Sequence, residues 1–307
     1  MQHYRQKLFC YIAVILACEL SACSRTESNA ATEEMTDPTT TYSIVRSDSS
    51  NGIEIIGNGG NNPLKVREAI RNYVISEKNF TAKRAKLYSL LNQLDKYTHA
   101  DSVNYNEVDS LNYLSIHYLE DLLQNPQSIT SGIRHKMLHI SISPDKCLRI
   151  YSWNENISPK WESYINIYQY RRQDGSLTVA FNEEENRLHD ASDFRSGKTD
   201  KITHLFAKGD SCDLYLIQFS GCQGKEHLFK GVGCIGISPE GLLFNHPAFD
   251  AKIPSISLHY PANGSATIVY DSRKRRLQLQ RIQPKQLQED TLMRTYLYNG
   301  KHFTLAE

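Results

Sequence analysis

A series of short apolar segments separated by turn sequences fills the second half of the chain, from residue 136 to 305. The sequence Ser143-Pro144-Asp145-Lys146 puts proline at the second position of a turn, and Gln173-Asp174-Gly175 is typical of a tight hairpin. The flanking segments are rich in β-branched residues and tyrosine, which favour strands. Because strands joined by tight turns pair with their neighbours, this pattern predicts an antiparallel meander curled into a sandwich, a barrel or a partial propeller.

The segment before the strands has the apolar spacing of helices. Apolar residues recur at three- and four-residue steps within residues 66–74, 85–94 and 108–122. The chain is therefore predicted to be α+β, with a small N-terminal helical segment at residues 63–130 and an antiparallel β domain at residues 131–307.

Capping residues define the predicted helix ends. Thr81 is the expected N-cap of the second helix, and Asn104 with Glu107 three residues later resembles a capping box. Asn125-Pro126 should end the third helix, because the residue before a proline avoids the helical conformation.

The first 22 residues have the layout of an export signal. An apolar run from Leu8 to Cys18 follows three basic residues, His3, Arg5 and Lys7. This run is too short to span ~30 Å of hydrocarbon. The stretch Leu20-Ser21-Ala22-Cys23 resembles the lipobox of bacterial lipoproteins. That resemblance implies removal of residues 1–22 as a signal peptide and acylation of Cys23. The alternatives are an uncleaved apolar N-terminus and an ordinary secretory signal.

Acyl chains on Cys23 would hold the protein on a membrane of the cell envelope, because each buried methylene contributes ~0.8 kcal/mol. Ser24 follows the cysteine, and by the sorting rule of such lipoproteins the absence of Asp there implies the outer membrane. Residues 23–62 are polar and are expected to form a disordered tether. Within them, residues 42–45 and 53–56 can form two short strands around Ser50-Asn51-Gly52.

Charge and cysteine content limit the classes of partner. The formal net charge of +1 gives no overall field that favours nucleic acid. Cys222 and Cys234 are the first candidate disulfide because they fall on one predicted hairpin. A turn near residues 224–226 would, however, place Cys234 opposite Tyr215, and free buried cysteines are an equal alternative. A zinc site is not favoured because the chain has no C-x-x-C pair, and no cofactor is expected.

Aromatic residues are densest in one part of the predicted sheet, and Arg149, Asn154 and Arg171 lie nearby in the sequence. The cluster consists of Trp153, Trp161, Tyr164, Tyr168 and Tyr170. The three tyrosines share strand parity and should line one face, where they would form a platform for a sugar or a peptide. The simpler interpretation is that these rings fill the core of the sheet.

Candidates for chemistry are few. His189, Asp190 and Asp193 could serve as acid–base groups of a hydrolase, although they lie in a polar, highly charged loop whose solvation explains them equally well. His135 and His139 would share one face of a strand and could meet a metal, but no third ligand is fixed. The basic turn Arg273 to Arg276 could contact anionic lipid, with a solvated turn as the simpler interpretation.

Three stretches carry a resemblance to a known family. They are Ser143 to Trp153, which contains R-I-Y-S-W, then Ile167 to Tyr170 and Tyr298 to Phe303. They resemble a family of uncharacterised bacterial envelope lipoproteins, loosely over residues 64–307. That resemblance implies a helical segment before a β domain and implies no activity. The family's Gly-Gly-Thr-type turn is replaced here by Ile157 to Trp161.

The sequence therefore predicts a lipid-anchored envelope protein without enzymatic activity, which presents a binding surface to a glycan, a peptide or a partner protein. The alternative is an envelope-associated hydrolase that acts on a polymer. A third hypothesis is a scaffold that binds only other envelope proteins.

Overall fold

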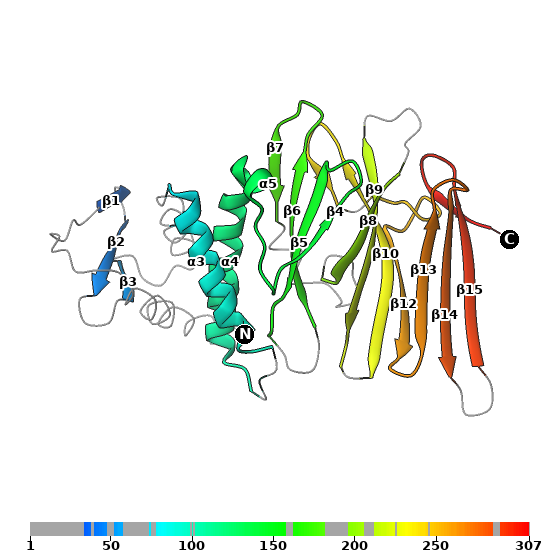
Figure 1. The fold of residues 1–307 in the computed structure, drawn as a ribbon, viewed down its shortest axis with the longest axis horizontal. Coiled ribbons are helices and arrows are strands. Elements are labelled where there is room, and N and C mark those ends of the chain that lie inside the picture. Colours follow the sequence, from blue (N-terminus) through cyan, green and yellow to red (C-terminus); the bar gives the residue numbers. More distant parts are fainter. Residues whose placement is uncertain are drawn as a thin grey trace. The chain divides into compact units, whose positions relative to one another are not determined.

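The computed structural model shows two compact units, residues 1–125 and 126–307, each considered by itself (Figure 1). The boundary lies five residues before the start expected for the β domain. The structure describes residues 34–37, 40–47, 52–57, 74, 78–98, 100, 102–157, 162–181, 196–205, 212–224, 226–244, 246–284 and 289–306.

Within the first unit, three short strands form an antiparallel sheet in the order β1-β2-β3: Glu34–Asp37, Thr40–Ser47 and Gly52–Gly57. Strands β2 and β3 contain the two strands predicted around Ser50-Asn51-Gly52. Their register opposes Tyr42 to Gly57 and Ser47 to Gly52.

Two long helices follow, α3 (Phe80–Asp95) and α4 (Tyr105–Gln124). The N-cap of α3 is Asn79 and not Thr81, because the Asn79 side chain accepts hydrogen bonds from the backbone N–H groups of Thr81 and Ala82. Asn104 is the N-cap of α4 as expected, since its side chain accepts from the Glu107 N–H, while the Glu107 carboxylate accepts from the Asn104 side-chain amide. The helix predicted within residues 66–74 lies outside the described residues except for Val74, and no described helix is long and apolar enough to cross a membrane.

The second unit begins with the short helix α5 (Gln127–Ser131) and continues as three antiparallel sheets. The first sheet has the order β4-β5-β6-β7: His139–Ile142, Leu148–Asn154, Tyr164–Arg171 and Leu177–Ala180. The second sheet has the strand order β11-β10-β9-β8, and β12 also pairs with β10. Its strands are Lys198–Leu205 (β8), Asp213–Cys222 (β9), His227–Ile237 (β10), Leu242–Leu243 (β11) and Ser255–Pro261 (β12). The third sheet has the order β13-β14-β15-β16: Ser265–Asp271, Arg276–Pro284, Glu289–Tyr298 and Phe303–Leu305. The predicted α+β class with an antiparallel meander is confirmed.

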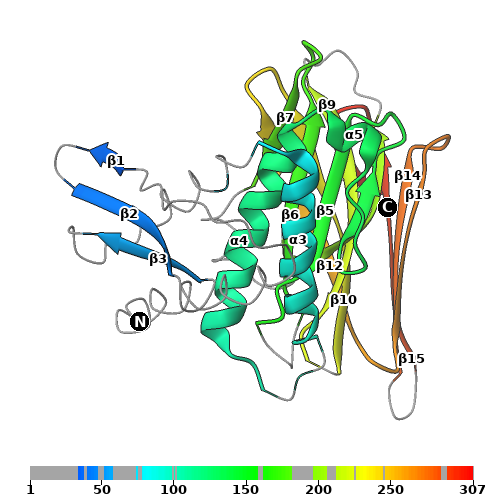
Figure 2. The ribbon, with the colours of Figure 1, turned by 60° about the vertical axis from the view of Figure 1, so that its left-hand side comes forward.

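The second sheet lies between the other two and is buried on both faces (Figures 1 and 2). On β9 and β10, one set of alternate residues packs in a core with the third sheet: Leu214, Leu216, Val232 and Cys234. The other set packs in a core with the first sheet: Tyr215, Ile217, Ile235 and Ile237. Successive side chains of a strand point to opposite faces, so burial of both faces explains the nearly continuous apolar run of β10.

Two glycines in this sheet make room for aromatic rings on the neighbouring strand. A Cβ atom at Gly231 would lie 2.2 Å from Phe219 Cζ and 2.7 Å from the Ile256 carbonyl oxygen. A Cβ atom at Gly221 would lie 2.4 Å from Phe229 Cζ. Glycine inside a strand is therefore required here by the close approach of a ring across the strand pair.

The register of β9 and β10 excludes the predicted disulfide. Cys222 opposes Leu228 and Cys234 opposes Leu216, so the two cysteines lie six residue pairs apart along the ladder. At ~3.3 Å per residue this is roughly 20 Å, far beyond the ~7 Å between Cα atoms that a disulfide allows. None of the four described cysteines forms a disulfide, and burial raises the pKa of the Cys234 thiol.

Because both faces of the second sheet are buried, we expect a substitution on either face to lower the stability of the protein. Leu216→Ala and Ile235→Ala, which empty opposite faces of the second sheet, should each lower the free energy of unfolding by about 2–5 kcal/mol. Val269→Ala, at a site 49% exposed, should cost less than about 1 kcal/mol. Denaturant unfolding of the three variants measures the differences. If either core variant behaved like Val269→Ala, that face would not be packed as described.

Candidate functional site

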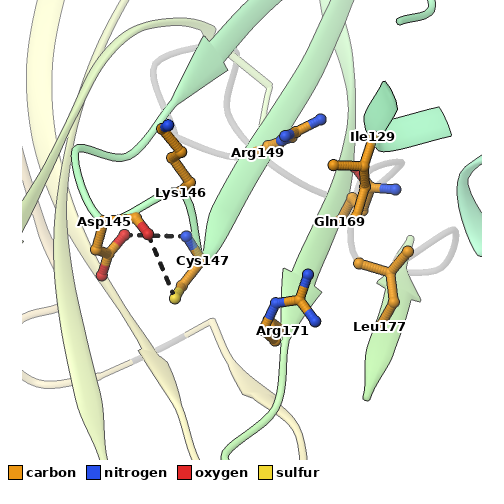
Figure 3. A pocket seen from close by; sticks show the side chains of 8 residues that line it. All are labelled: Ile129, Asp145, Lys146, Cys147, Arg149, Gln169, Arg171 and Leu177. Carbon is orange, nitrogen blue, oxygen red and sulfur yellow. Dashed lines mark hydrogen bonds between the residues drawn. The ribbon is translucent and has the colours of Figure 1, made fainter. Parts of the chain in front are cut away.

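A pocket of about 190 Å³ lies beside the β4–β5 turn, where the start of β5, the end of β6 and the start of β7 adjoin α5 (Figure 3). Its lining combines charged, polar and apolar side chains: Ile129, Asp145, Lys146, Cys147, Arg149, Gln169, Arg171 and Leu177. All of these residues belong to the second unit.

Asp145 forms one wall of the pocket, and its charge is already satisfied by the protein. Its Oδ1 atom accepts hydrogen bonds from the Ser143 hydroxyl at 2.5 Å and from the Cys147 N–H at 3.1 Å. Its Oδ2 atom accepts from the Tyr215 hydroxyl at 2.8 Å and lies 3.4 Å from His204 Nδ1. A carboxylate has about four acceptor positions, so the three hydrogen bonds use most of the acceptor capacity of Asp145, with His204 beside it.

These contacts decide the protonation states of Asp145 and Tyr215, the pair of residues that joins the first and second sheets. Burial acts to raise the pKa of Asp145, but the hydrogen bonds from Ser143, Cys147 and Tyr215 and the nearby His204 together lower it. Burial, followed by the hydrogen bond to Asp145 and its charge, raises the pKa of Tyr215. The Tyr215 hydroxyl therefore stays protonated at neutral pH and remains a donor to the Asp145 carboxylate.

His204 on β8 completes this contact between the layers. Its ring stacks on Tyr215 with the ring centres 5.0 Å apart, and its Nε2 atom lies 3.6 Å from Asp213 Oδ1. The imidazole thus sits between a carboxylate of the β4–β5 turn and a carboxylate of β9. We name Asp145, His204, Asp213 and Tyr215 the interlayer cluster.

Three cations line the same pocket without a balancing acid. Arg149 and Arg171 project from the paired strands β5 and β6, and Lys146 lies in the turn (Figure 3). Arg171 Nη1 donates to the Gly175 carbonyl at 2.8 Å, which restrains its position. Among the described residues none of the three forms an ion pair within 4.0 Å, and the hydrogen bonds that Asp145 accepts come from other groups. The described part of the pocket is therefore cationic.

The remaining lining is ordered and partly apolar. Gln169 Nε2 donates to Ser128 Oγ at 2.8 Å, and its Oε1 accepts from the Tyr151 hydroxyl at 3.4 Å. Ile129 and Leu177 add an aliphatic wall. The arrangement can hold an anionic group between the arginines while a short apolar part rests on that wall.

Cys147 lies in the pocket but is not an activated nucleophile. Burial, followed by the charges of Asp145 and Asp213, raises the pKa of its thiol, and Arg171 opposes this only in part. The thiolate is the reactive form of cysteine, so a raised pKa leaves little of it at neutral pH. Within the ranges that the structure describes, no three His, Cys, Asp or Glu residues gather as a metal site.

The predicted aromatic platform is wrong for three of its members. Trp153 is 1% exposed, and Tyr168 and Tyr170 are each 3% exposed. Tyr168 and Tyr170 do share one face, but that face packs against the second sheet, so the alternative of core packing holds for them. Tyr164 is half-buried and donates to Glu162, and Trp161 lies outside the described residues.

Some of the other predicted site residues lie outside the described ranges, and two predicted to share a strand face do not. Cys23, His189, Asp190 and Asp193 lie outside the described residues. The expectation that His135 and His139 share a strand face is wrong, because β4 begins only at His139 and the His135 ring accepts a hydrogen bond from the Met137 N–H in the preceding turn.

In the sequence, both arginines stand out only as neighbours of the aromatic residues. The available signal was their parity, because Arg149 and Arg171 fall on the strand face opposite to Tyr168 and Tyr170. Tyr215, which secures Asp145, is 70 residues away in the chain, and no local pattern connects the two.

Asp145→Asn should destabilise the protein by about 1–3 kcal/mol, because an amide cannot replace a carboxylate that accepts from several donors. The lowered pKa of Asp145 means that its stabilisation is present above about pH 4 and is lost as pH falls through that pKa. Denaturant unfolding as a function of pH should therefore show a weaker loss of stability in acid for the variant than for the parent. Asp213→Asn, at a side chain 53% exposed, is the matched control and should cost less. Equal costs for the two variants would contradict the role given to Asp145.

Comparison with known proteins adds no relative: no family model matches the chain, and no curated protein or solved structure shows significant similarity to it.

Proposed function

We propose that the chain is a lipid-anchored envelope protein whose β unit binds the acidic group of a small ligand, or of the end of a glycan or peptide. The observation that carries this proposal is the set of three cations, Lys146, Arg149 and Arg171, around a pocket whose single acid is satisfied by the protein.

The chemistry of arginine supports an anion as the ligand. A guanidinium presents a planar set of donors that matches carboxylate and phosphate oxygens, and charged hydrogen bonds of this kind contribute about 1.5–3 kcal/mol each. Because Asp145 already accepts three hydrogen bonds and lies beside His204, it is poorly placed to bind an amine. A purely anionic group therefore suits the pocket better than a zwitterion.

The size of the pocket limits what enters it. A volume of about 190 Å³ is below the ~300–1,000 Å³ typical of sites that enclose a drug-sized ligand. The pocket therefore suits one acidic group with a few neighbouring atoms. The glycan or peptide expected from the sequence would insert its acidic end here and leave the rest in solvent.

The location rests on Leu20-Ser21-Ala22-Cys23 and the export-like residues before it. An acylated Cys23 would keep the pocket within reach of ligands of the cell envelope. No observation on the described residues favours the alternative of a hydrolase, whose candidate groups are His189, Asp190 and Asp193.

Arg149→Gln and Arg171→Gln should each weaken binding of an acidic ligand at least about tenfold, because each removes a charged donor from the pocket. Titration calorimetry with glucuronate and N-acetylglutamate, against the neutral glucose and N-acetylglutamine, measures the preference. Lys201→Gln, an exposed cation on β8 outside the pocket, is the charge-matched control. Equal binding of acidic and neutral compounds, or equal losses in all three variants, would overturn the assignment of the pocket.

Cys23→Ala should release the protein from the membrane fraction into the soluble envelope fraction, because no acyl chain can then be attached. Fractionation of cells that express the parent and the variant measures this, and Cys147→Ala serves as the control for loss of a thiol. Unchanged membrane association of Cys23→Ala would refute the lipid anchor without bearing on the pocket.

A further inference from the structure

The turn between β13 and β14 presents four consecutive cations on a fixed backbone. They are Arg273, Lys274, Arg275 and Arg276, of which the first three are exposed. The Asp271 carboxylate accepts from the N–H groups of Arg273 and Lys274, both at 3.0 Å. The Arg275 carbonyl accepts from the Tyr298 N–H at 2.8 Å, which ties the turn to β15. The cations are therefore held at one end of the third sheet.

The positive charge of this turn is poorly balanced. Asp271, the last residue of β13, is the only acid within residues 271–276, and its carboxylate already accepts hydrogen bonds from the backbone. Hydrogen bonds from the N–H groups of Lys274 and Arg273, with the charges of Lys274 and Arg276, lower the pKa of Asp271. In the described part of the chain none of the four cations forms an ion pair within 4.0 Å. The turn thus carries a local surplus of charge that the net charge of +1 does not reveal.

Exposed aliphatic side chains adjoin the turn on the outer face of the third sheet. Leu297 is 47% exposed and directly opposes Arg276 on the neighbouring strand. Val269 is 49% exposed and opposes Gln278 in the next row. Tyr296 and Tyr298 point to the opposite, buried face of the sheet. Cations and aliphatic side chains therefore share one exposed corner, with no aromatic residue of β15 beside them.

We propose that this corner, Arg273 to Arg276 with Leu297 and Val269, docks on the surface of a bilayer that contains anionic lipids. Lipid phosphates attract Lys and Arg, and aliphatic side chains can enter the boundary between headgroups and acyl chains. Single-stranded nucleic acid would require aromatic rings for base stacking, which this corner does not present. The proposal rests on the proposed function only for the location of the chain, because the corner's chemistry is independent of Cys23.

The test compares vesicle binding of full-length variants that all carry Cys23→Ala, so that no lipid anchor contributes. Affinity is measured by co-sedimentation with phosphatidylglycerol-containing vesicles at low salt. The affinity of R273Q/K274Q/R275Q should be about a hundredfold lower than that of the parent, because each cation near an anionic surface contributes about 1 kcal/mol. Binding should weaken at high salt and be absent with pure phosphatidylcholine. The matched control K78Q/K96Q/K201Q removes three exposed cations elsewhere and should keep the parent affinity.

Two results would overturn the proposal. One is an equal loss of affinity in both triple variants, which would make the attraction a property of total charge. The other is binding to soluble polyglutamate without binding to the vesicles, which would identify an acidic polymer as the partner. Circular dichroism of each variant shows that the fold is retained. Because Cys23 is already replaced, failure of vesicle binding leaves the proposed anchor and pocket untouched.

Discussion

Burial of both faces of the second sheet is the constraint on which the rest of the β unit depends. Each strand of this sheet must contribute apolar side chains in both directions, at about 1.5–3 kcal/mol for each large side chain fully buried. Leu216 and Ile235 belong to different cores for this reason. The first and third sheets each cover one of these faces, and residues of both belong to the two cores that the second sheet forms.

The same arrangement produces the candidate site. Tyr215 belongs to the face of β9 that packs on the first sheet, so its hydroxyl reaches the Asp145 carboxylate in the β4–β5 turn at 2.8 Å. Asp145 makes its contacts with Tyr215, His204 and its own turn, and the cations of the pocket form no ion pair with it within 4.0 Å. A contact that fixes the layers therefore also leaves Arg149 and Arg171 available to an external anion.

Local chemistry explains which features the sequence predicts and which it does not. Ser143-Pro144-Asp145-Lys146 and Gln173-Asp174-Gly175 specify their hairpins within a few residues, so the meander could be recognised. Strand parity correctly placed Tyr168 and Tyr170 on one face, but it could not say that another sheet covers that face. The pocket was missed because the contact that completes it joins β9 to a turn 70 residues earlier in the chain.

The two proposed binding surfaces should act independently of each other. The pocket belongs to the first sheet and the basic turn to the third, with the second sheet between them (Figure 1). Packed sheets are ~10 Å apart, so two such spacings exceed the ~8 Å Debye length at physiological ionic strength. A ligand anion beside Arg149 would therefore hardly change the attraction of Arg273 to a membrane. The proposed binding of an acidic ligand and the proposed contact with a membrane would therefore not compete with each other.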